Sequence, residues 1–279
     1  MPHDPSLAAV AAGPCVALDL GSSRVRAGLP GRPVLVDRPS SFGPDRRPGA
    51  GPAARPAPIR HGLVDDVNAC AGLARGALHE MVDDRTPGLI LLGVPTAAGD
   101  AHLRRVLAAV HAAAPVPVCT VDAPLAAALG GGINATDPRP RVIMDIGAGI
   151  VEMAVVAHGS TRTTRSIQYV PEYSPGRATA RLPSYVVDRL AIDLRRMLDS
   201  LPAPSRMRAR DGGLLLTGGG SLLPSLPGRL TARVRLSVTV ARDPAHATIR
   251  GLVHLCAASP AVRERAAVTV HRPGRPLTA

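Results

Sequence analysis

The stretch from Val16 to Leu29 decides the fold and reads VALDLGSSRVRAGL. A short apolar run leads to Asp19, small residues follow at Gly21-Ser22-Ser23, and a second apolar run begins at Val25. Two apolar runs joined by a short turn rich in Gly and Ser are typical of a β-hairpin. We therefore expect a hairpin that carries a carboxylate beside its turn.

The same pattern returns in the segment 142–155, VIMDIGAGIVEMAV, where Asp145 stands 126 positions after Asp19. Both stretches contain an apolar triplet, an Asp, an aliphatic residue, a Gly and a turn of small residues. The repeat predicts two homologous halves, each opened by one hairpin.

A third glycine motif, LTGGGSLLPSL, occupies residues 216–226 and is expected at a junction between a strand and a helix that starts near Ser221. A carboxylate next to exposed backbone N–H groups suits a metal-bound polyphosphate, and glycine lets the backbone come close to it. A single Asp-x-Gly hairpin is usually only a tight turn. The repeat and the third motif, in this order, favour a phosphate site instead.

Apolar periodicity indicates alternating strands and helices along the rest of the chain. Strands are expected at 34–36, 89–94, 116–121, 163–170, 214–216 and 236–240, and helices at 63–82, 102–113, 124–129, 185–198, 221–233 and 245–257. The segments 39–58 and 171–183 are rich in Pro, Gly and Arg, and they are expected to be irregular.

Six segments together resemble the actin, Hsp70 and sugar-kinase ATPase superfamily, and most closely its bacterial MreB branch. The segments 19–28, 145–156 and 216–226 are similar to the two phosphate loops and the adenosine motif. IRHGLVDDV (59–67), VDAPLAAALGGG (121–132) and DPAHATIRG (243–251) are similar to the re-entry into the first domain and to the two helices that connect the domains.

The resemblance implies an α/β fold with two RNase-H-like, actin-like ATPase domains that flank a nucleotide cleft. The first half would span 14–132, with a flexible loop at 39–58, and the second half 133–251, with a shortened connection at 171–183. A helix at 252–265 would pack back near the first half, and 266–279 would be a loose tail. The two outer subdomains of MreB relatives are largely absent, because only the two short segments stand in their places.

The resemblance also assigns a site that binds ATP with Mg²⁺, at reduced affinity because one wall of the adenine pocket is missing. The nucleotide-binding residues would be Asp19, Gly21, Ser22, Ser23, Arg26, Asp145, Gly147, Ala148, Gly149, Gly218, Gly219 and Gly220. Asp19 and Asp145 would hold Mg²⁺ through its waters.

The catalytic groups of the family are mostly missing. Ala123 stands where relatives place the Glu or Gln that orients the attacking water, and Ile150 and Val151 replace a pair of Thr residues. Glu152 is the one candidate catalytic residue, although a plain strand carboxylate would look the same in sequence. The adjacent Asp122 is better explained as a residue that starts a helix.

The composition narrows the other function classes. The chain has 279 residues and a net charge of +12, and its basic residues are all Arg, with no Lys. The positive charge can therefore reflect either a biased composition or a functional anion-binding surface. With one Phe, three Tyr and no Trp, a stacking platform for nucleic acid is disfavoured. The four cysteines are widely spaced, which indicates buried thiols rather than a disulfide framework or a zinc site.

We expect a cytoplasmic protein, with peripheral contact at the inner face of an anionic membrane as a further expectation. The sequence favours an MreB-like, actin-like nucleotide-binding protein involved in cell shape or wall organisation, with weak or no hydrolysis, that associates with itself or with a full-length MreB-type filament. The alternative is a pseudo-ATPase scaffold that binds a protein partner or such a filament and needs no nucleotide.

Overall fold

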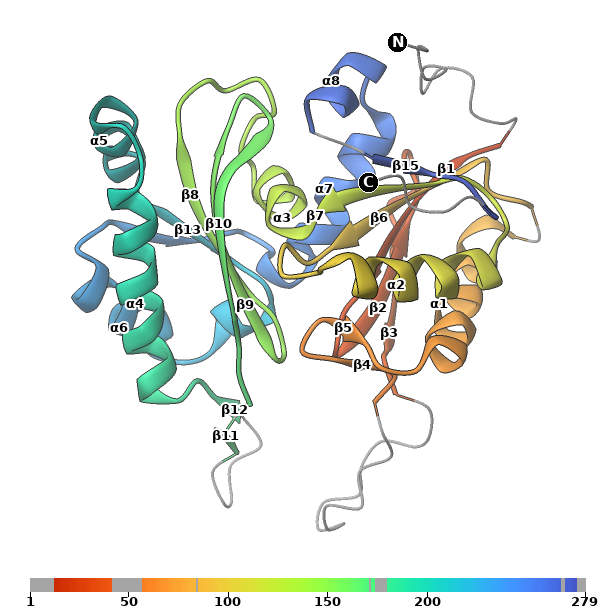
Figure 1. Cartoon of the computed structure of the whole chain (residues 1–279), viewed down its shortest axis with the longest axis horizontal. Helices are drawn as coiled ribbons and strands as arrows, with labels where there is room; N and C mark the ends of the chain where they lie inside the picture. The colour runs from red at the N-terminus through yellow and green to blue at the C-terminus, as the bar shows by residue number, and fades with distance from the viewer. Residues whose placement is uncertain are drawn as a thin grey trace.

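A computed structural model describes residues 13–41, 57–83, 85–170, 172–173, 180–266 and 269–274. It consists of two α/β halves that lie side by side (Figure 1). The expected flexible loop at 39–58 falls mostly outside the described residues, as does most of the connection at 171–183.

The sheet of the first half has the strand order β15-β7-β6-β1-β2-β3. Its strands are β1 (Cys15–Leu20), β2 (Arg24–Gly28), β3 (Val36–Pro39), β6 (Leu89–Val94), β7 (Val118–Asp122) and β15 (Thr269–His271). The sheet of the second half has the order β10-β9-β8-β13-β14. Its strands are β8 (Arg141–Ile146), β9 (Ile150–Ala157), β10 (Ser160–Gln168), β13 (Leu214–Thr217) and β14 (Val238–Val240).

Apart from β15, the two sheets share one topology. In each half the first three strands are antiparallel neighbours, and the last two strands add in parallel beside the first strand. The two hairpin turns also match in detail, because Gly21 N–H donates to Arg24 O at 3.0 Å and Gly147 N–H donates to Ile150 O at 2.9 Å. The common topology agrees with the duplication that the repeated hairpins predict.

Helices cover both faces of each sheet. The longer ones are α1 (Val67–Val82), α2 (Asp100–Ala113), α3 (Ala123–Gly130), α4 (Ser184–Asp199), α5 (Ala203–Asp211), α6 (Leu226–Val234), α7 (Ala247–Ala257) and α8 (Pro260–Arg265). Short elements complete the described chain: β4 (Ile59–Arg60), β5 (Leu63–Val64), β11 (Glu172–Tyr173), β12 (Ala180–Arg181) and the 3₁₀ turns Gly219–Leu222 and Pro244–His246. No helix in the described ranges is long and apolar enough to cross a bilayer.

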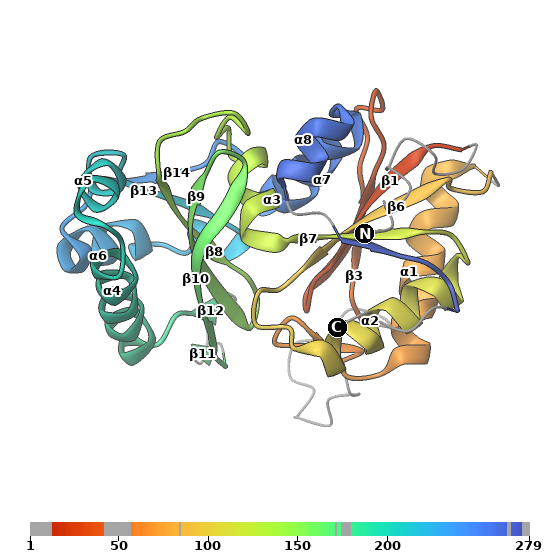
Figure 2. The same ribbon diagram turned by 45° about the horizontal axis from the view of Figure 1, so that its top comes forward.

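The last helix of each half packs on the sheet of the other half. α1 and α2 bury their apolar sides with Val16 and Leu18 of β1, and α4 and α6 do the same on the second sheet. α3 follows the first sheet but packs against β8 and β9, whereas α7 follows the second sheet but packs against β1 and β6. This exchange, visible between the halves in Figure 2, joins them through one shared apolar cluster.

Two glycines let α3 and α7 touch where they cross. A Cβ atom on Gly130 would lie 1.8 Å from the carbonyl oxygen of Ala247, and one on Gly251 would lie 1.8 Å from that of Ala126. Since no real Cβ atom fits at such a distance, only glycine allows this approach. The crossing fixes how the two halves meet.

Three sequence expectations need correction. The helix expected from Leu63 begins at Val67, because 59–64 form a small hairpin and Asp66 accepts a hydrogen bond from Ala69 N–H as the N-cap. The helix expected from Ser221 begins only at Leu226, because Ser225 has a left-handed backbone with φ of 63°. The tail after 265 is not loose throughout, because Thr269–His271 pair with β7 as β15.

Candidate functional site

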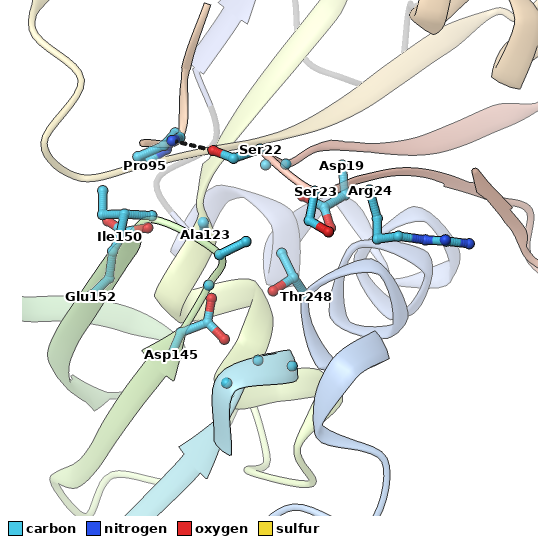
Figure 3. A pocket seen from close by; sticks show the side chains of 18 of the residues that line it. Asp19, Ser22, Ser23, Arg24, Pro95, Ala123, Asp145, Ile150, Glu152 and Thr248 are labelled. Atoms are coloured by element: carbon cyan, nitrogen blue, oxygen red, sulfur yellow. Dashed lines mark hydrogen bonds between the residues drawn. The ribbon is translucent and has the colours of Figure 1, made fainter. Parts of the chain in front are cut away.

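A cavity of about 340 Å³, the central cavity, lies between the two halves. The turns of both hairpins and the third glycine motif line it, together with the start of α3 and the start of α7. Figure 3 shows Asp19 and Ser23 on one side of it and Asp145 on the other. The three motifs that the sequence singles out therefore meet at one place.

The two carboxylates occupy equivalent positions near the ends of β1 and β8. Asp145 accepts a hydrogen bond from Thr217 Oγ1 at 2.8 Å, and Asp19 lies 3.6 Å from Arg26 Nη1. Burial raises the pKa of Asp19, and burial together with the charge of Asp19 raises the pKa of Asp145 to about 6. Two buried carboxylates, one of which raises the pKa of the other, favour a cation beside them.

The donor set fits a magnesium ion that keeps most of its waters. Carboxylate oxygens are the ligands that Mg²⁺ prefers, and this ion is usually held by one or two of them with phosphate oxygens and water. Within the described ranges, no group of three or more His, Cys, Asp or Glu side chains could enclose a metal ion. Asp19 and Asp145 could therefore bind Mg²⁺ beside a phosphate chain, but not as a closed protein cage.

The third glycine motif presents bare backbone to the central cavity. Gly218 has φ of 77°, and a Cβ there would lie 2.4 Å from the carbonyl oxygen of Ile146. A Cβ on Gly220 would lie 2.4 Å from the Ile146 side chain, whereas one on Gly219 would meet nothing within 4 Å. Gly218 and Gly220 thus allow the motif to pack directly on Ile146 of β8, and Gly219 faces open space.

Arg26 is less available than the sequence suggests. Its Nη1 lies 3.6 Å from Asp19, and its Nε lies 3.3 Å from Asp37 Oδ1. Asp37 also accepts hydrogen bonds from Arg24 Nε at 2.7 Å and faces His246 Nε2 at 3.0 Å. Burial raises the pKa of Asp37, but its partners Arg24, His246 and Arg26 outweigh burial, and the net shift is downward. The positive charge of Arg26 is therefore largely balanced by the carboxylates of Asp19 and Asp37, which leaves less of it to attract an anion.

Two sets of contacts cross from one half to the other beside the central cavity. Glu152 on β9 accepts hydrogen bonds from Thr96 N–H at 2.6 Å and from Thr96 Oγ1 at 2.8 Å. His61 Nδ1 lies 3.0 Å from the carbonyl oxygen of Gly149. The neighbouring Gly62 N–H donates to Ser22 Oγ at 2.7 Å, the bond drawn in Figure 3. The segment after β4 thereby connects the first hairpin turn to the second.

Comparison with known proteins shows which proteins this chain is similar to. Residues 45–173 match a family model described as MreB/Mbl protein. The cell shape-determining protein Mbl of Bacillus subtilis is 21% identical over 307 residues, covering 82% of this chain and 91% of Mbl. The cell shape-determining protein MreB of Escherichia coli is 22% identical over 286 residues, covering 81% of this chain and 82% of MreB.

The chain is similar to the MreB and Mbl proteins. Its fold agrees with the crystal structure of MreB5 of Spiroplasma citri bound to ADP, with a TM-score of 0.72 at 18% identity over 86% of this chain and 94% of that one. It also agrees with MamK in a double helical filament, with a TM-score of 0.68 at 14% identity over 89% of this chain and 100% of MamK. The actin-like α/β fold expected from the sequence is confirmed.

The MreB-like chain is shorter than its relatives. The alignments with Mbl and MreB, at 307 and 286 residues, are longer than this chain of 279 residues. Such alignments must contain positions at which the relative has a residue and this chain has none. This agrees with the expected loss of the outer subdomains.

Most of the expected site residues of the MreB-like chain meet at the central cavity. Those that line it are Asp19, Gly21, Ser22, Ser23, Arg26, Asp145, Gly147, Ala148, Gly218, Gly219, Gly220 and Glu152. Gly149 is not among them, because it faces His61, whose Nδ1 would be 3.0 Å from an added Cβ. Val151 lies in the apolar core of the second half, so only Ile150 of the replaced Thr pair reaches the cavity.

Glu152 differs from the exposed strand carboxylate that the sequence left open. Its side chain is buried, the residue being 3% exposed, and burial raises its pKa to about 7 although the bonds from Thr96 lower it. Ala123 and Ile150 lie next to it at the cavity wall (Figure 3). No sequence pattern marks Thr96, whereas His61 and Thr248 lie in the segments 59–67 and 243–251, which the resemblance marks as connections and not as parts of the site.

Proposed function

We propose that this MreB-like chain binds ATP with Mg²⁺ in the central cavity, hydrolyses it weakly or not at all, and contributes to cell shape or wall organisation. One observation carries the proposal: Asp19 and Asp145, at the ends of two equivalent hairpins, line the same cavity. The relatives named cell shape-determining proteins and the neighbour bound to ADP support it.

Different residues of the central cavity contact different parts of the nucleotide in this proposal. The backbone N–H groups of both hairpin turns, with Ser22 and Ser23, contact the phosphates, and the bare surface at Gly219 faces the nucleoside. Asp19 and Asp145 hold Mg²⁺ through its waters. When bound there, Mg²⁺ would offset the negative charge of the phosphates. The cavity of about 340 Å³ is near the lower end of the roughly 300–1,000 Å³ of ligand pockets, which supports reduced affinity.

Hydrolysis is weak in this proposal because Ala123 stands where relatives place the water-orienting Glu or Gln. Ala123 offers only a methyl group, and Ile150 adds apolar surface where relatives have a hydroxyl. Glu152 is already engaged with Thr96. Its catalytic role would require this contact to open.

We further propose that the halves act as domains at 14–132 and 133–251, and that the chain associates with copies of itself or with a full-length MreB-type filament. The neighbour MamK, solved as a double helical filament, supports self-association. The proposed location is the cytoplasm. The net charge of +12 supports contact with the inner face of an anionic membrane.

The second candidate function is a scaffold that needs no nucleotide. The contacts of Thr96 with Glu152 and of His61 with Gly149 favour it, because they connect the two halves through groups of the chain itself. The absence of a polar side chain at Ala123 favours it as well.

A thermal melt separates the two. A ligand at about 100 times its Kd stabilises the folded state by about 2.7 kcal/mol, or roughly 5 °C in a chain of this size. We expect such a rise with millimolar Mg·ATP and not with Mg·GTP. Asp19→Ala and Asp145→Ala should abolish the rise, whereas Asp83→Ala, which removes an exposed carboxylate paired with Arg32, should keep it.

A second pair of variants tests the place of the ligand. Gly219→Val puts a side chain into open space in the cavity wall, so it should remove the rise with Mg·ATP and leave the melting temperature of the free protein nearly unchanged. Gly99→Val, at an exposed site outside the cavity where a Cβ also meets nothing within 4 Å, is the control. If the wild type shows no rise with any nucleotide, the scaffold function stands instead.

A further inference from the structure

We propose that Cys15 and Cys256 form a reversible disulfide, which makes this chain responsive to thiol oxidation. The two Sγ atoms lie 2.9 Å apart although 241 positions separate the residues in the sequence. A disulfide requires an S–S distance of about 2.05 Å, so the sulfurs must approach by a little less than 1 Å. The proposal is independent of nucleotide binding.

The pair joins two elements that are far apart in the chain. Cys15 is the first residue of β1, and Cys256 lies near the end of α7, the helix that follows the second sheet and packs on the first one. The other end of each element reaches the central cavity, with Asp19 on β1 and Thr248 on α7. A bond between Cys15 and Cys256 would therefore fix α7 to the first sheet.

The surroundings distinguish the two thiols. A hydrogen bond with Cys256 and the charge of Arg263 lower the pKa of Cys15, although burial opposes them. The hydrogen bond with Cys15 and burial raise the pKa of Cys256. Arg263 also has a buried Nε with no hydrogen-bond partner in the described part of the chain, so it can donate to a thiolate. Cys15, which is partly exposed, is the nucleophile of the pair.

The reaction is an exchange with a low-molecular-weight disulfide such as glutathione disulfide. The Cys15 thiolate attacks one sulfur of the reagent, breaks its S–S bond and releases one thiolate. Cys256 then loses its proton and attacks Cys15 Sγ, which releases the second thiolate. In sum, two protein thiols are oxidised to one disulfide, and one small disulfide is reduced to two thiols.

The other two cysteines provide the contrast. Cys70 lies on α1 and Cys119 on β7, both buried, and burial raises the pKa of each to about 12. Both thiols therefore stay protonated at neutral pH and react slowly. They serve as internal controls for selectivity.

The test uses the whole chain in its native state. The protein is reduced with a phosphine, transferred to millimolar glutathione disulfide, and blocked with a thiol reagent before peptide mapping by mass spectrometry. We expect one disulfide, between the peptides of Cys15 and Cys256, which a reducing agent reverses. Closing a loop this long should raise the melting temperature by roughly 4–8 °C.

The variants make the result specific. Cys70→Ser should keep both the bridge and the rise in melting temperature, and Cys15→Ser and Cys256→Ala should each lose both. Four results would overturn the proposal: glutathione remaining attached to Cys15, pairing only after denaturation, a bridge that involves Cys70 or Cys119, or no rise in melting temperature on oxidation.

Discussion

Replacing Glu152 with Gln should make the folded state more stable at alkaline pH than at acidic pH, relative to the wild type. Glu152 is buried, and its pKa rises from 4.5 to about 7 in the folded chain. A shift of one pKa unit corresponds to 1.36 kcal/mol, so ionising this side chain costs about 3 kcal/mol of stability. Gln keeps an oxygen that can accept from Thr96 but cannot ionise.

The sign follows from proton binding. Between pH 4.5 and pH 7, the folded chain holds a proton on Glu152 that the unfolded chain has lost, so wild-type stability falls as the pH rises through this window. The burial of Asp19 and Asp145 raises their pKa and acts in the same direction. The pH dependence that Asp19 and Asp145 cause is present in both the wild type and Glu152→Gln, so it cancels when the stabilities of the two proteins are subtracted.

The assay is urea unfolding of the wild type and Glu152→Gln at pH 5 and pH 8. The difference between the two proteins should shift by roughly 2–3 kcal/mol in favour of the variant at the higher pH. Glu80→Gln, at an exposed glutamate on α1 that pairs with Arg38, is the control and should show no such shift. An equal difference at both pH values would refute the reasoning, because it would mean that Glu152 ionises in the folded chain as easily as in water.

Three other changes test other parts of the structure. Gly251→Ala should destabilise the fold by about 3 kcal/mol or more in urea unfolding, because its Cβ would lie 1.8 Å from the Ala126 carbonyl oxygen. The control is Gly76→Ala on α1, where an added Cβ meets nothing within 4 Å, and it should raise the free energy of unfolding by up to about 1 kcal/mol. Thr217→Val removes the hydroxyl that donates to Asp145, and it should lower the free energy of unfolding by about 1–3 kcal/mol at pH 8 and by less at pH 4, where the carboxyl is protonated. An equal loss of stability at both pH values would contradict this. Ala123→Glu should raise Mg²⁺-dependent phosphate release by roughly tenfold or more in a colorimetric assay, and no change would mean that the other losses dominate.

The sequence predicts best those elements that one local pattern defines. The strand 89–94 is a continuous apolar run between Gly88 and Pro95, and the structure has it with the same bounds. Both hairpins were likewise expected, because each places a small-residue turn between two apolar runs. Helix α5 was missed, because among its side chains only Ala209 is buried and no apolar periodicity marks it.

The parts of the site that sequence reasoning missed depend on contacts between distant residues. Thr96 meets Glu152 across 56 positions and His61 meets Gly149 across 88, and neither contact has a local signal. The close crossing of α3 and α7 depends in the same way on Gly130 and Gly251, two residues far apart in the chain. The approach of Cys15 to Cys256, across 241 positions, likewise has no local signal.

The short strand β15 has a consequence for how molecules of this protein meet each other. It pairs antiparallel with β7, with Val270 opposite Cys119, and it forms the outer edge of the first sheet. Without it, the backbone N–H and C=O groups of β7 would form an open edge, onto which a strand of another molecule could add. Residues 269–271 therefore cover β7 with a strand of only three residues, which offers a shorter edge for edge-to-edge pairing, and a fusion partner should be separated from them by a linker.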